Sequence, residues 1–213
     1  MAIFELSRMQ IDASRYPWGY RPLQYALSFA ADNSYVESID NVGIQGNEER
    51  EVQLSIKGAA TSTRSAIFMW AGSDGQRDAF SLIFENNTLR VESFYDGFDT
   101  GWTPPRNDIF YHIKVTFINE VLGISINNGE ELDYVNNIGS LNTVDSPLRI
   151  CRYWQYGVDD RFWNGQVKEL FIWDYNGVLK IGYNMQEGSG DVLNDISGNN
   201  NYGTIYGATW VEI

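Results

Sequence analysis

The C-terminal part of the chain carries the pattern that decides its fold. Positions 182–190 read GYNMQEGSG, positions 194–203 read NDISGNNNYG and positions 204–211 read TIYGATWV. The glycines at 188, 190, 198 and 203 permit left-handed backbone where turns reverse direction. Asp195 and the asparagines at 199 to 201 can hydrogen-bond nearby backbone groups in such turns. We therefore expect two tight turns, followed by a closing strand in which Trp210 fills the core.

Strand signals are dense from residue 24 onward. Residues 51–57 alternate strictly between polar and apolar side chains, which is typical of a half-buried strand. Residues 79–84 and 89–94 flank a turn at 85–88 and predict a hairpin, whose Asn86-Asn87-Thr88 glycosylation sequon we interpret as part of the turn. Further strands are predicted at 24–29, 66–70, 111–117, 122–126, 148–152, 166–173, 179–183 and 204–211. About ten to twelve short strands without a helical period predict an all-β fold, a two-sheet antiparallel jelly-roll sandwich.

The order of these segments resembles the laminin-G-like members of the concanavalin-A-like lectin/glucanase superfamily. The C-terminal stretch is similar to that family's closing pattern, an EGSG turn, a D-x-SGN-x-N-x-G turn and a final GATW strand. Weaker similarities lie at 26–29 with 34–36, at 111–116 and at 162–170. The resemblance covers residues 24–213, which we expect to form one laminin-G-like domain. Residues 1–23 are interpreted as an N-terminal extension or assembly arm. A matching fold implies function only loosely.

The charge balance excludes several partners. Twenty-eight acidic residues against 15 basic ones give a net charge of −13, which disfavours nucleic acid and anionic lipid surfaces and leaves cations or neutral ligands. No apolar stretch is long enough to span a bilayer, so membrane insertion is not expected. Residues 1–8 lack the pattern of a secretion signal. We expect a cytoplasmic protein or, for a virion component, one that reaches the exterior by lysis.

The sequence predicts no catalytic activity. The resemblance brings in glucanases, which place acids at E-x-D-x-x-E spacing, and the nearest approach here, at 131–136, ends in Asn136 where the second catalytic acid would stand. That segment also follows a turn at 127–129 and is not predicted as a strand of the concave face. The set of acids that general acid/base catalysis requires is therefore incomplete. The single histidine, His112, is expected to be a packed structural residue, and Cys151 a buried, inert thiol within a strand.

Two aromatic-rich loops, at 94–106 and 152–163, are the predicted ligand surface. Aromatic faces stack on sugar rings, while neighbouring polar side chains can hold hydroxyl groups. The same composition describes a protein–protein hot spot, and loops that fold back over a sheet edge would also explain it. The predicted ligand-binding residues are Tyr95, Phe98, Trp102, Arg152, Tyr153, Trp154, Tyr156, Asp159 and Asp160.

Two turns offer oxygen ligands for Ca²⁺. Asp32 and Asn33 follow the first family strand, and Asn194 and Asp195 lie in the closing turn. The resemblance implies that the first and last parts of the domain lie side by side, so these carboxylates and amides are candidate metal ligands. Turn chemistry alone explains the same residues. No cofactor is required, and Ca²⁺ is an optional ligand.

Two functions from different classes remain open. The first is a non-catalytic, lectin-like binding module that recognises a glycan or cell-surface polymer through the aromatic loops. The alternative is a structural or decoration protein of a phage virion or another assembly, which uses the sandwich for protein–protein contacts. The missing secretion signal and the arm before the domain favour this alternative, in which the chain would be an oligomer or part of a particle. The resemblance favours the lectin.

Overall fold

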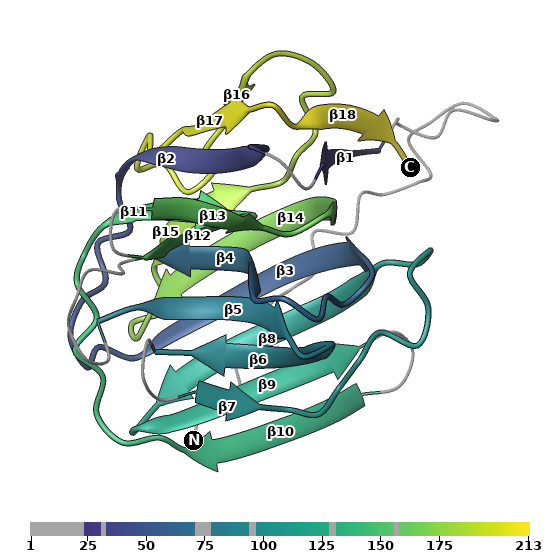
Figure 1. The fold of residues 1–213 in the computed structure, drawn as a ribbon. Helices are drawn as coiled ribbons and strands as arrows, with labels where there is room; N and C mark the ends of the chain where they lie inside the picture. Colours follow the sequence, from purple (N-terminus) through teal and green to yellow (C-terminus); the bar gives the residue numbers. More distant parts are fainter. Residues whose placement is uncertain (1–23, 31–32, 71–77, 94–96, 128–130, 156–157) are drawn as a thin grey trace, which may run out of the picture.

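The strands of this protein form two sheets that pack face to face (Figure 1). The computed structural model describes residues 24–30, 33–70, 78–93, 97–127, 131–155 and 158–213, and these contain no helix. Sheet A comprises β1 (Tyr25–Phe29), β3 (Arg50–Gly58), β8 (Tyr111–Ile118), β9 (Val121–Asn127), β10 (Glu131–Asn137), β14 (Gly165–Asp174), β15 (Leu179–Tyr183) and β18 (Thr209–Glu212). Sheet B comprises β2 (Tyr35–Asn41), β4 (Ser65–Trp70), β5 (Phe80–Glu85), β6 (Thr88–Glu92), β7 (Gly97–Asp99), β11 (Pro147–Ile150), β12 (Arg152–Gln155), β13 (Val158–Phe162), β16 (Val192–Leu193) and β17 (Gly203–Tyr206).

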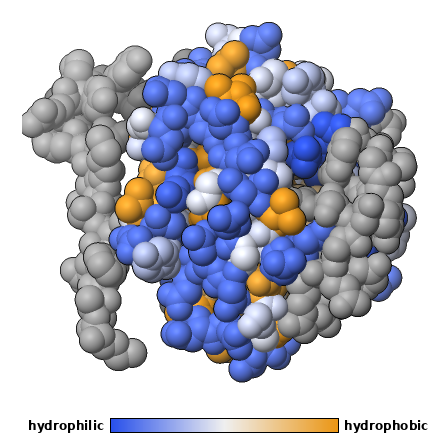
Figure 2. All heavy atoms as spheres, turned by 90° about the vertical axis from the view of Figure 1, so that its left-hand side faces the viewer, coloured by the Kyte–Doolittle hydropathy of each residue, from blue (hydrophilic) through white to orange (hydrophobic). Residues whose placement is uncertain are grey.

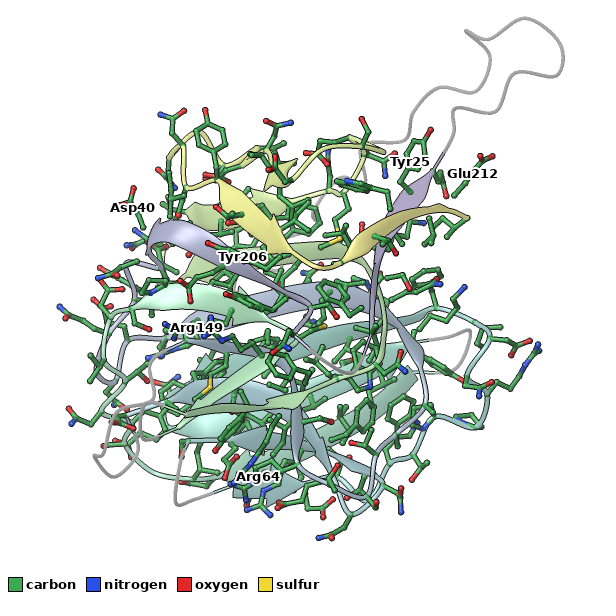
Figure 3. All side chains as sticks on the ribbon, turned by 45° about the horizontal axis from the view of Figure 1, so that its top comes forward. Tyr25, Asp40, Arg64, Arg149, Tyr206 and Glu212 are labelled. Carbon is green, nitrogen blue, oxygen red and sulfur yellow. The ribbon has the colours of Figure 1, made fainter. Side chains whose placement is uncertain are left out.

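The strand order confirms the predicted two-sheet antiparallel sandwich. Sheet A runs β10-β9-β8-β3-β14-β1-β18, and β15 pairs with the second half of β14. Sheet B runs β16-β17-β2-β11-β4-β5-β6-β7, and the β12–β13 hairpin joins it through one parallel pair, Phe162 with Ala66. The first and last strands are neighbours, so Tyr25 lies beside Glu212 (Figure 3). Among the described residues there is no helix with the length and apolar character needed to cross a membrane.

Most of the predicted strands are present, but the predicted number was too low. The segments predicted as single strands at 148–152 and 204–211 are each divided, the second into β17 of sheet B and β18 of sheet A. The alternation missed β2, β7, β10, β13 and β16, which are short, polar or irregular. Cys151 is buried as expected, yet it stands between β11 and β12 with a φ of 62° and not inside a strand. The residue therefore marks the point where the chain leaves sheet B for the β12–β13 hairpin. The predicted arm at 1–23 lies outside the described residues and stays a prediction.

The space between the sheets is filled by inward-facing residues of both. Large side chains at its centre, such as Trp70, Phe84, Phe117 and Trp163, are fully buried. Trp210, expected in the core, packs only partly against its edge, and its indole N–H donates to the carbonyl of Gly190 at 2.8 Å. Burial of this apolar area, at about 25 cal/mol per Å², is the main stabilising contribution.

A buried arginine closes one end of this core. Arg50, 1% exposed, lies over the rings of Trp70, Phe80 and Phe117 at 5.8, 5.2 and 5.5 Å from their centroids. Its guanidinium donates to the carbonyls of Glu48 and Gly46 and to the hydroxyl of Thr143, at 2.8, 2.8 and 2.9 Å. Burial lowers the pKa of Arg50 to about 10, so the cation persists at neutral pH. Aromatic faces and oriented acceptors replace the water that the charge has lost.

The predicted hairpin at 85–88 is confirmed, with Glu85 paired to Thr88. Both central residues are left-handed, with φ of 53° at Asn86 and 66° at Asn87, the backbone of a type I′ turn. Asparagine tolerates this conformation better than other residues that carry a Cβ. The geometry of this turn therefore explains the two asparagines of the sequon.

Replacing Asn87 tests this turn. We expect Asn87→Ala to lower the free energy of unfolding by about 1 kcal/mol, because an alanine Cβ is unfavourable in left-handed backbone. Asn87→Gly should change it by only a few tenths of a kcal/mol, since glycine adopts positive φ freely. Urea unfolding at 25 °C measures both. Equal values for the two variants would contradict the assigned turn.

Replacing Arg50 tests the closure of the core. We expect Arg50→Met, which keeps most of the volume, to lower the free energy of unfolding by about 3 kcal/mol, because the buried Thr143 hydroxyl and two part-buried carbonyls lose their donor. The control is Arg106→Met, which removes an ion pair with Asp108 that is more than 60% exposed on both sides. Its effect should be much smaller than that of Arg50→Met, because solvent screens an exposed ion pair. Similar losses in both variants would show that Arg50 is not a structural cation.

Candidate functional site

The first predicted aromatic loop contributes to the core instead of to the surface. Trp102 is 8% exposed and meets Tyr111 edge-to-face, with ring centroids 5.2 Å apart. Phe98 lies in β7, where it is partly buried against the core. Tyr95 lies outside the described residues. Both described rings therefore pack against the core.

The second predicted loop forms the β12–β13 hairpin, which covers the outer face of sheet B. Tyr153 is 1% exposed and packs with Ala66, Met69 and Ile83 in a small second core. The guanidinium of Arg152 lies 4.1 Å from the ring centroid of Tyr35 and 3.5 Å from the carboxylate of Glu37. The backbones of Trp154, Asp159 and Asp160 belong to the hairpin, whereas their side chains, like Tyr156 as a whole, lie outside the described residues.

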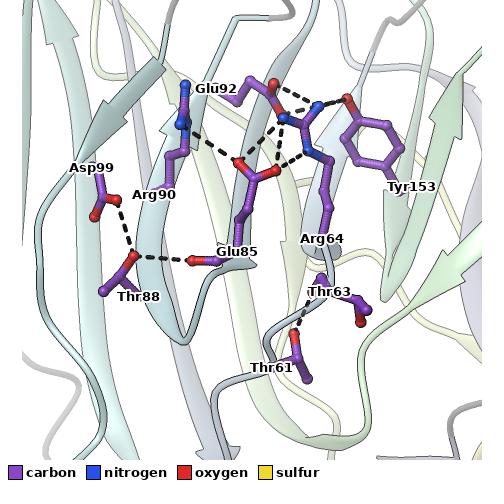
Figure 4. Close-up of polar contacts among 9 residues, drawn as sticks. All are labelled: Thr61, Thr63, Arg64, Glu85, Thr88, Arg90, Glu92, Asp99 and Tyr153. Atoms are coloured by element: carbon purple, nitrogen blue, oxygen red, sulfur yellow. Dashed lines mark hydrogen bonds and ion pairs between the residues drawn. The ribbon is translucent and has the colours of Figure 1, made fainter.

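A charged network fixes Tyr153 beneath this hairpin (Figure 4). Arg64 pairs with Glu85 at 3.0 Å and with Glu92 at 2.9 Å, and the Tyr153 hydroxyl donates to Glu92 at 3.3 Å. Burial raises the pKa of Glu92, and burial raises the pKa of Tyr153 to about 12. Every member of this network has a partner within it. The arrangement holds the hairpin on the sheet and leaves the tyrosine unavailable for stacking on a ligand.

Of the four predicted calcium ligands, three lie within the described residues. Asp195 accepts hydrogen bonds from the amides of Gly182, Ser197 and Asn201, at 2.9, 3.0 and 2.9 Å, and from the hydroxyl of Ser197 at 2.6 Å. Asn194 is exposed, and Asn33 is exposed with a φ of 63°. Asp32 lies outside the described residues. Across the described part of the chain, no three His, Cys, Asp or Glu residues are grouped as a metal site would need. Calcium binding stays a prediction.

His112 is not packed in the core, contrary to expectation. Its side chain is 43% exposed on the outer face of sheet A, where its Nδ1 lies 3.3 Å from the Ser55 hydroxyl and 3.8 Å from Glu169. Strand alternation explains the position, because Tyr111 and Ile113 take the inward sites of β8. Ser55 donates to Glu169 at 2.6 Å, and His112 and Ser55 lower the pKa of Glu169.

This Ser–His–Glu cluster does not form a catalytic triad. In a triad the serine donates to one imidazole nitrogen and the acid orients the other. Here Ser55 and Glu169 both approach Nδ1 of His112, and the serine proton is directed to the carboxylate. The cluster instead stabilises the centre of the outer face by cross-strand hydrogen bonds.

A β-bulge in β14 determines which side chains reach that outer face. Val167 pairs with Ile56 and Glu169 with Ser55, so Lys168 is the extra residue. An extra residue reverses the alternation beyond it. Phe171 and Trp173 therefore point outward, while Leu170 and Ile172 are fully buried.

The outward residues form cross-strand rows over β14, β3 and β8. Phe171 of β14 lies opposite Gln53 of β3, which in turn lies opposite Lys114 of β8. Trp173 of β14 lies opposite Glu51 of β3. The rings of Phe171 and Trp173 are 5.7 Å apart and tilted by 41°. Tyr175 follows in the β14–β15 turn and is 64% exposed. Three aromatic rings thus succeed one another at every second residue toward the end of β14.

A hollow of about 340 Å³ opens beside these rings, and we call it the β14 groove. Its walls come from the start of β3, the outer face of β8 and the β14–β15 turn. The lining residues are Glu49, Arg50, Glu51, Gln53, Lys114, Ile118, Trp173, Asp174, Tyr175, Asn176 and Gly177. The volume lies within the range of small-molecule sites.

Several polar groups in the groove have no partner among the described residues. The ammonium of Lys114, the amide oxygen of Gln53 and the side-chain amide of Asn176 make no hydrogen bond or ion pair there. Donors and acceptors beside an aromatic ring are the combination that a sugar requires, since its hydroxyls need partners and its ring face is apolar. The groove can therefore bind a polyhydroxylated ligand.

The carboxylates of the groove are engaged as hydrogen-bond acceptors. Glu49 accepts the backbone amide of Asn119 at 3.0 Å, and Glu51 accepts the side-chain amide of Gln53 at 2.6 Å. Asp174 caps the turn by accepting the backbone amides of Asn176 and Val178 at 2.9 and 3.0 Å. These hydrogen bonds tie the three carboxylates to the strand and turn segments that surround the groove.

The sequence contained a signal for this site that the loop-based prediction missed. Phe171 and Trp173 lie at alternate positions of the strand predicted at 166–173, and Tyr175 follows two residues later. Aromatic residues in a strand are typical of a core, so the prediction placed the ligand surface in loops. Their outward direction depends on the bulge at Lys168, which no local pattern announces.

Comparison with known proteins supports the fold. No protein-family model and no curated protein matches the sequence. Among solved structures, a candidate carbohydrate-binding protein from Bacteroides ovatus matches with a TM-score of 0.64 and 16% identity over 91% of this chain and 61% of its own length. The CBM40 module of the Ruminococcus gnavus IT-sialidase, bound to α2,3-sialyllactose, matches with a TM-score of 0.52 and 12% identity over 70% of this chain and 89% of its own.

A laminin structure shows the same architecture. Domains LG4–5 of the mouse laminin α1 chain match with a TM-score of 0.51 and 12% identity, over 70% of this chain and 41% of the laminin fragment. This chain thus spans 61% of the Bacteroides protein and less than half of the laminin fragment. Similarity at such low identity establishes architecture. The chain therefore has a laminin-G-like β-sandwich fold.

Proposed function

We propose that this chain is a non-catalytic, lectin-like module that binds a glycan in the β14 groove. The observation that carries the proposal is the groove itself, in which Trp173 and Tyr175 stand beside polar side chains that have no partner among the described residues. Trp173, Gln53 and Lys114 of the groove lie on paired strands, which hold side chains more firmly than loops do. The β14–β15 turn adds Tyr175 beside them.

Two further observations support this proposal. Two of the structures with the same architecture carry carbohydrate-binding names, so the sandwich is suited to that purpose. The groove carboxylates are already engaged as hydrogen-bond acceptors within the protein, which favours a role in shaping the groove over one in hydrolysis. The role in a virion or another assembly, expected as the alternative, stays a prediction from the sequence.

Removing an aromatic ring from the groove tests the proposal. The probes are the neutral polysaccharides β-glucan, xylan, mannan, arabinan and galactan. Each is included in a native gel, in which a protein that binds the polysaccharide migrates more slowly. We expect at least one to retard the protein, and Trp173→Ala to weaken that binding about tenfold or more. The control is Tyr206→Ala, which removes a 42% exposed tyrosine stacked on Tyr35 in sheet B.

Two results would contradict the proposed function. Equal retardation of Trp173→Ala and the parent protein would place the binding surface elsewhere. Release of reducing sugar from the polysaccharide that is bound, measured with the parent protein over a day, would show that the module also hydrolyses its ligand. A fold check by near-ultraviolet circular dichroism separates loss of binding from loss of structure in each variant.

A further inference from the structure

A second hollow lies next to the β14 groove. It holds about 220 Å³ and is lined by Asp40, Asn41, Val42, Gly43, Lys180, Asn199 and Asn201; we call it the Asn199 hollow. Asp40, one of its lining residues, lies at the end of the sandwich opposite Tyr25 and Glu212 (Figure 3). Figure 2 looks onto this end of the molecule, whose surface is largely hydrophilic with scattered hydrophobic groups.

One ion pair separates the two hollows. Lys180 lines the Asn199 hollow and Asp174 lines the β14 groove, and the Lys180 Nζ is 3.3 Å from the Asp174 carboxylate. Both residues belong to the β14–β15 hairpin. Tyr175 and Val178, 64% and 51% exposed, lie on its turn. The ion pair therefore joins a residue that lines one hollow to a residue that lines the other, beside this exposed turn.

The Asn199 hollow also presents polar groups that no described residue satisfies. The carboxylate of Asp40 and the amide oxygen of Asn199 make no hydrogen bond or ion pair within the described part of the chain. The amide nitrogen of Asn199 donates to the carbonyls of Leu179 and Lys180 at 3.0 and 2.9 Å, which fixes the direction of its oxygen. Fixed acceptors of this kind suit the hydroxyl groups of a sugar.

The charges around both hollows select against anionic ligands. Glu49, Glu51, Asp174 and Asp40 supply four carboxylates, whereas Lys114 and Lys180 supply two ammonium groups, and the guanidinium of Arg50 is buried in the core. The chain as a whole carries a net charge of −13. A field of this sign lowers the local concentration of sialylated or uronate-containing sugars.

We infer that the ligand is an uncharged glycan chain of several sugar units that crosses the β14–β15 turn and occupies both hollows. This inference rests on the proposed function of the β14 groove and extends it. Trp173 and Tyr175 hold one part of the chain, and Asp40 and Asn199 accept hydrogen bonds from the hydroxyls of another part. Affinity then depends on the length of the chain, because only a long oligosaccharide reaches the second hollow.

Oligosaccharides of increasing length test this inference. From the neutral polysaccharide that retards the protein, fragments of one to six sugars are titrated by calorimetry. We expect the affinity to rise about tenfold or more from the disaccharide to the hexasaccharide. Asp40→Ala should weaken hexasaccharide binding about fivefold, since hydrogen bonds to a charged group are lost, and leave the disaccharide unaffected. Trp173→Ala should weaken both.

The control is Asp191→Ala, which removes an exposed carboxylate that lines neither hollow and should change nothing. Affinity that stops rising at the disaccharide, with Asp40→Ala unaffected, overturns the inference and leaves the proposed function standing. Tighter binding of polygalacturonate or 3′-sialyllactose than of the neutral fragments overturns the assignment of an uncharged ligand. If none of the five neutral polysaccharides is bound, the inference and the proposed function both fail.

Discussion

The candidate site depends on one extra residue in β14. Strand alternation allows only every second side chain to leave the core. Because Lys168 is inserted opposite β3, the residues beyond it reverse their direction: Leu170 and Ile172 enter the core, and Phe171 and Trp173 reach the surface. Without that bulge the two aromatic rings would face sheet B and the aliphatic side chains would face water. The same strand thus contributes to the core and carries the ligand surface, with no loop needed to position either.

The two sheets use their outer faces differently. Sheet B is covered by the β12–β13 hairpin, which Tyr153 and the pairs of Arg64 with Glu85 and Glu92 hold in place. Sheet A presents polar and aromatic rows to the surface along β3, β8 and β14. At the end of the sandwich where Arg50 closes the core, the β14 groove borders these rows. The buried cation keeps the start of β3 fixed, and Glu49 and Glu51 project from this segment into the groove.

Local sequence patterns predicted the fold because its determinants are local. Alternation at 51–57 specifies a half-buried strand, and the asparagines at 86 and 87 specify a tight turn, without information from distant residues. The functional residues were harder to predict. Trp102 and Tyr153 resemble ligand aromatics in sequence, yet both are buried by tertiary contacts. Trp102 packs against Tyr111 at the start of β8, and Tyr153 packs against Ile83, 70 residues away in the chain. Trp173 reads as a core residue, and only its pairing with β3 shows that it faces outward.

The buried thiol of Cys151 leaves the protein suitable for labelling at an introduced cysteine. It is the single cysteine of the chain, it is fully buried, and burial raises the pKa of its thiol, so alkylating reagents find no thiolate in the native state. A cysteine introduced on the surface can therefore carry a fluorophore or spin label at one defined position. The native thiol becomes reactive only when the core between the two sheets opens, because Cys151 packs in that core. Its rate of alkylation then reports how often the two sheets separate near the start of β12.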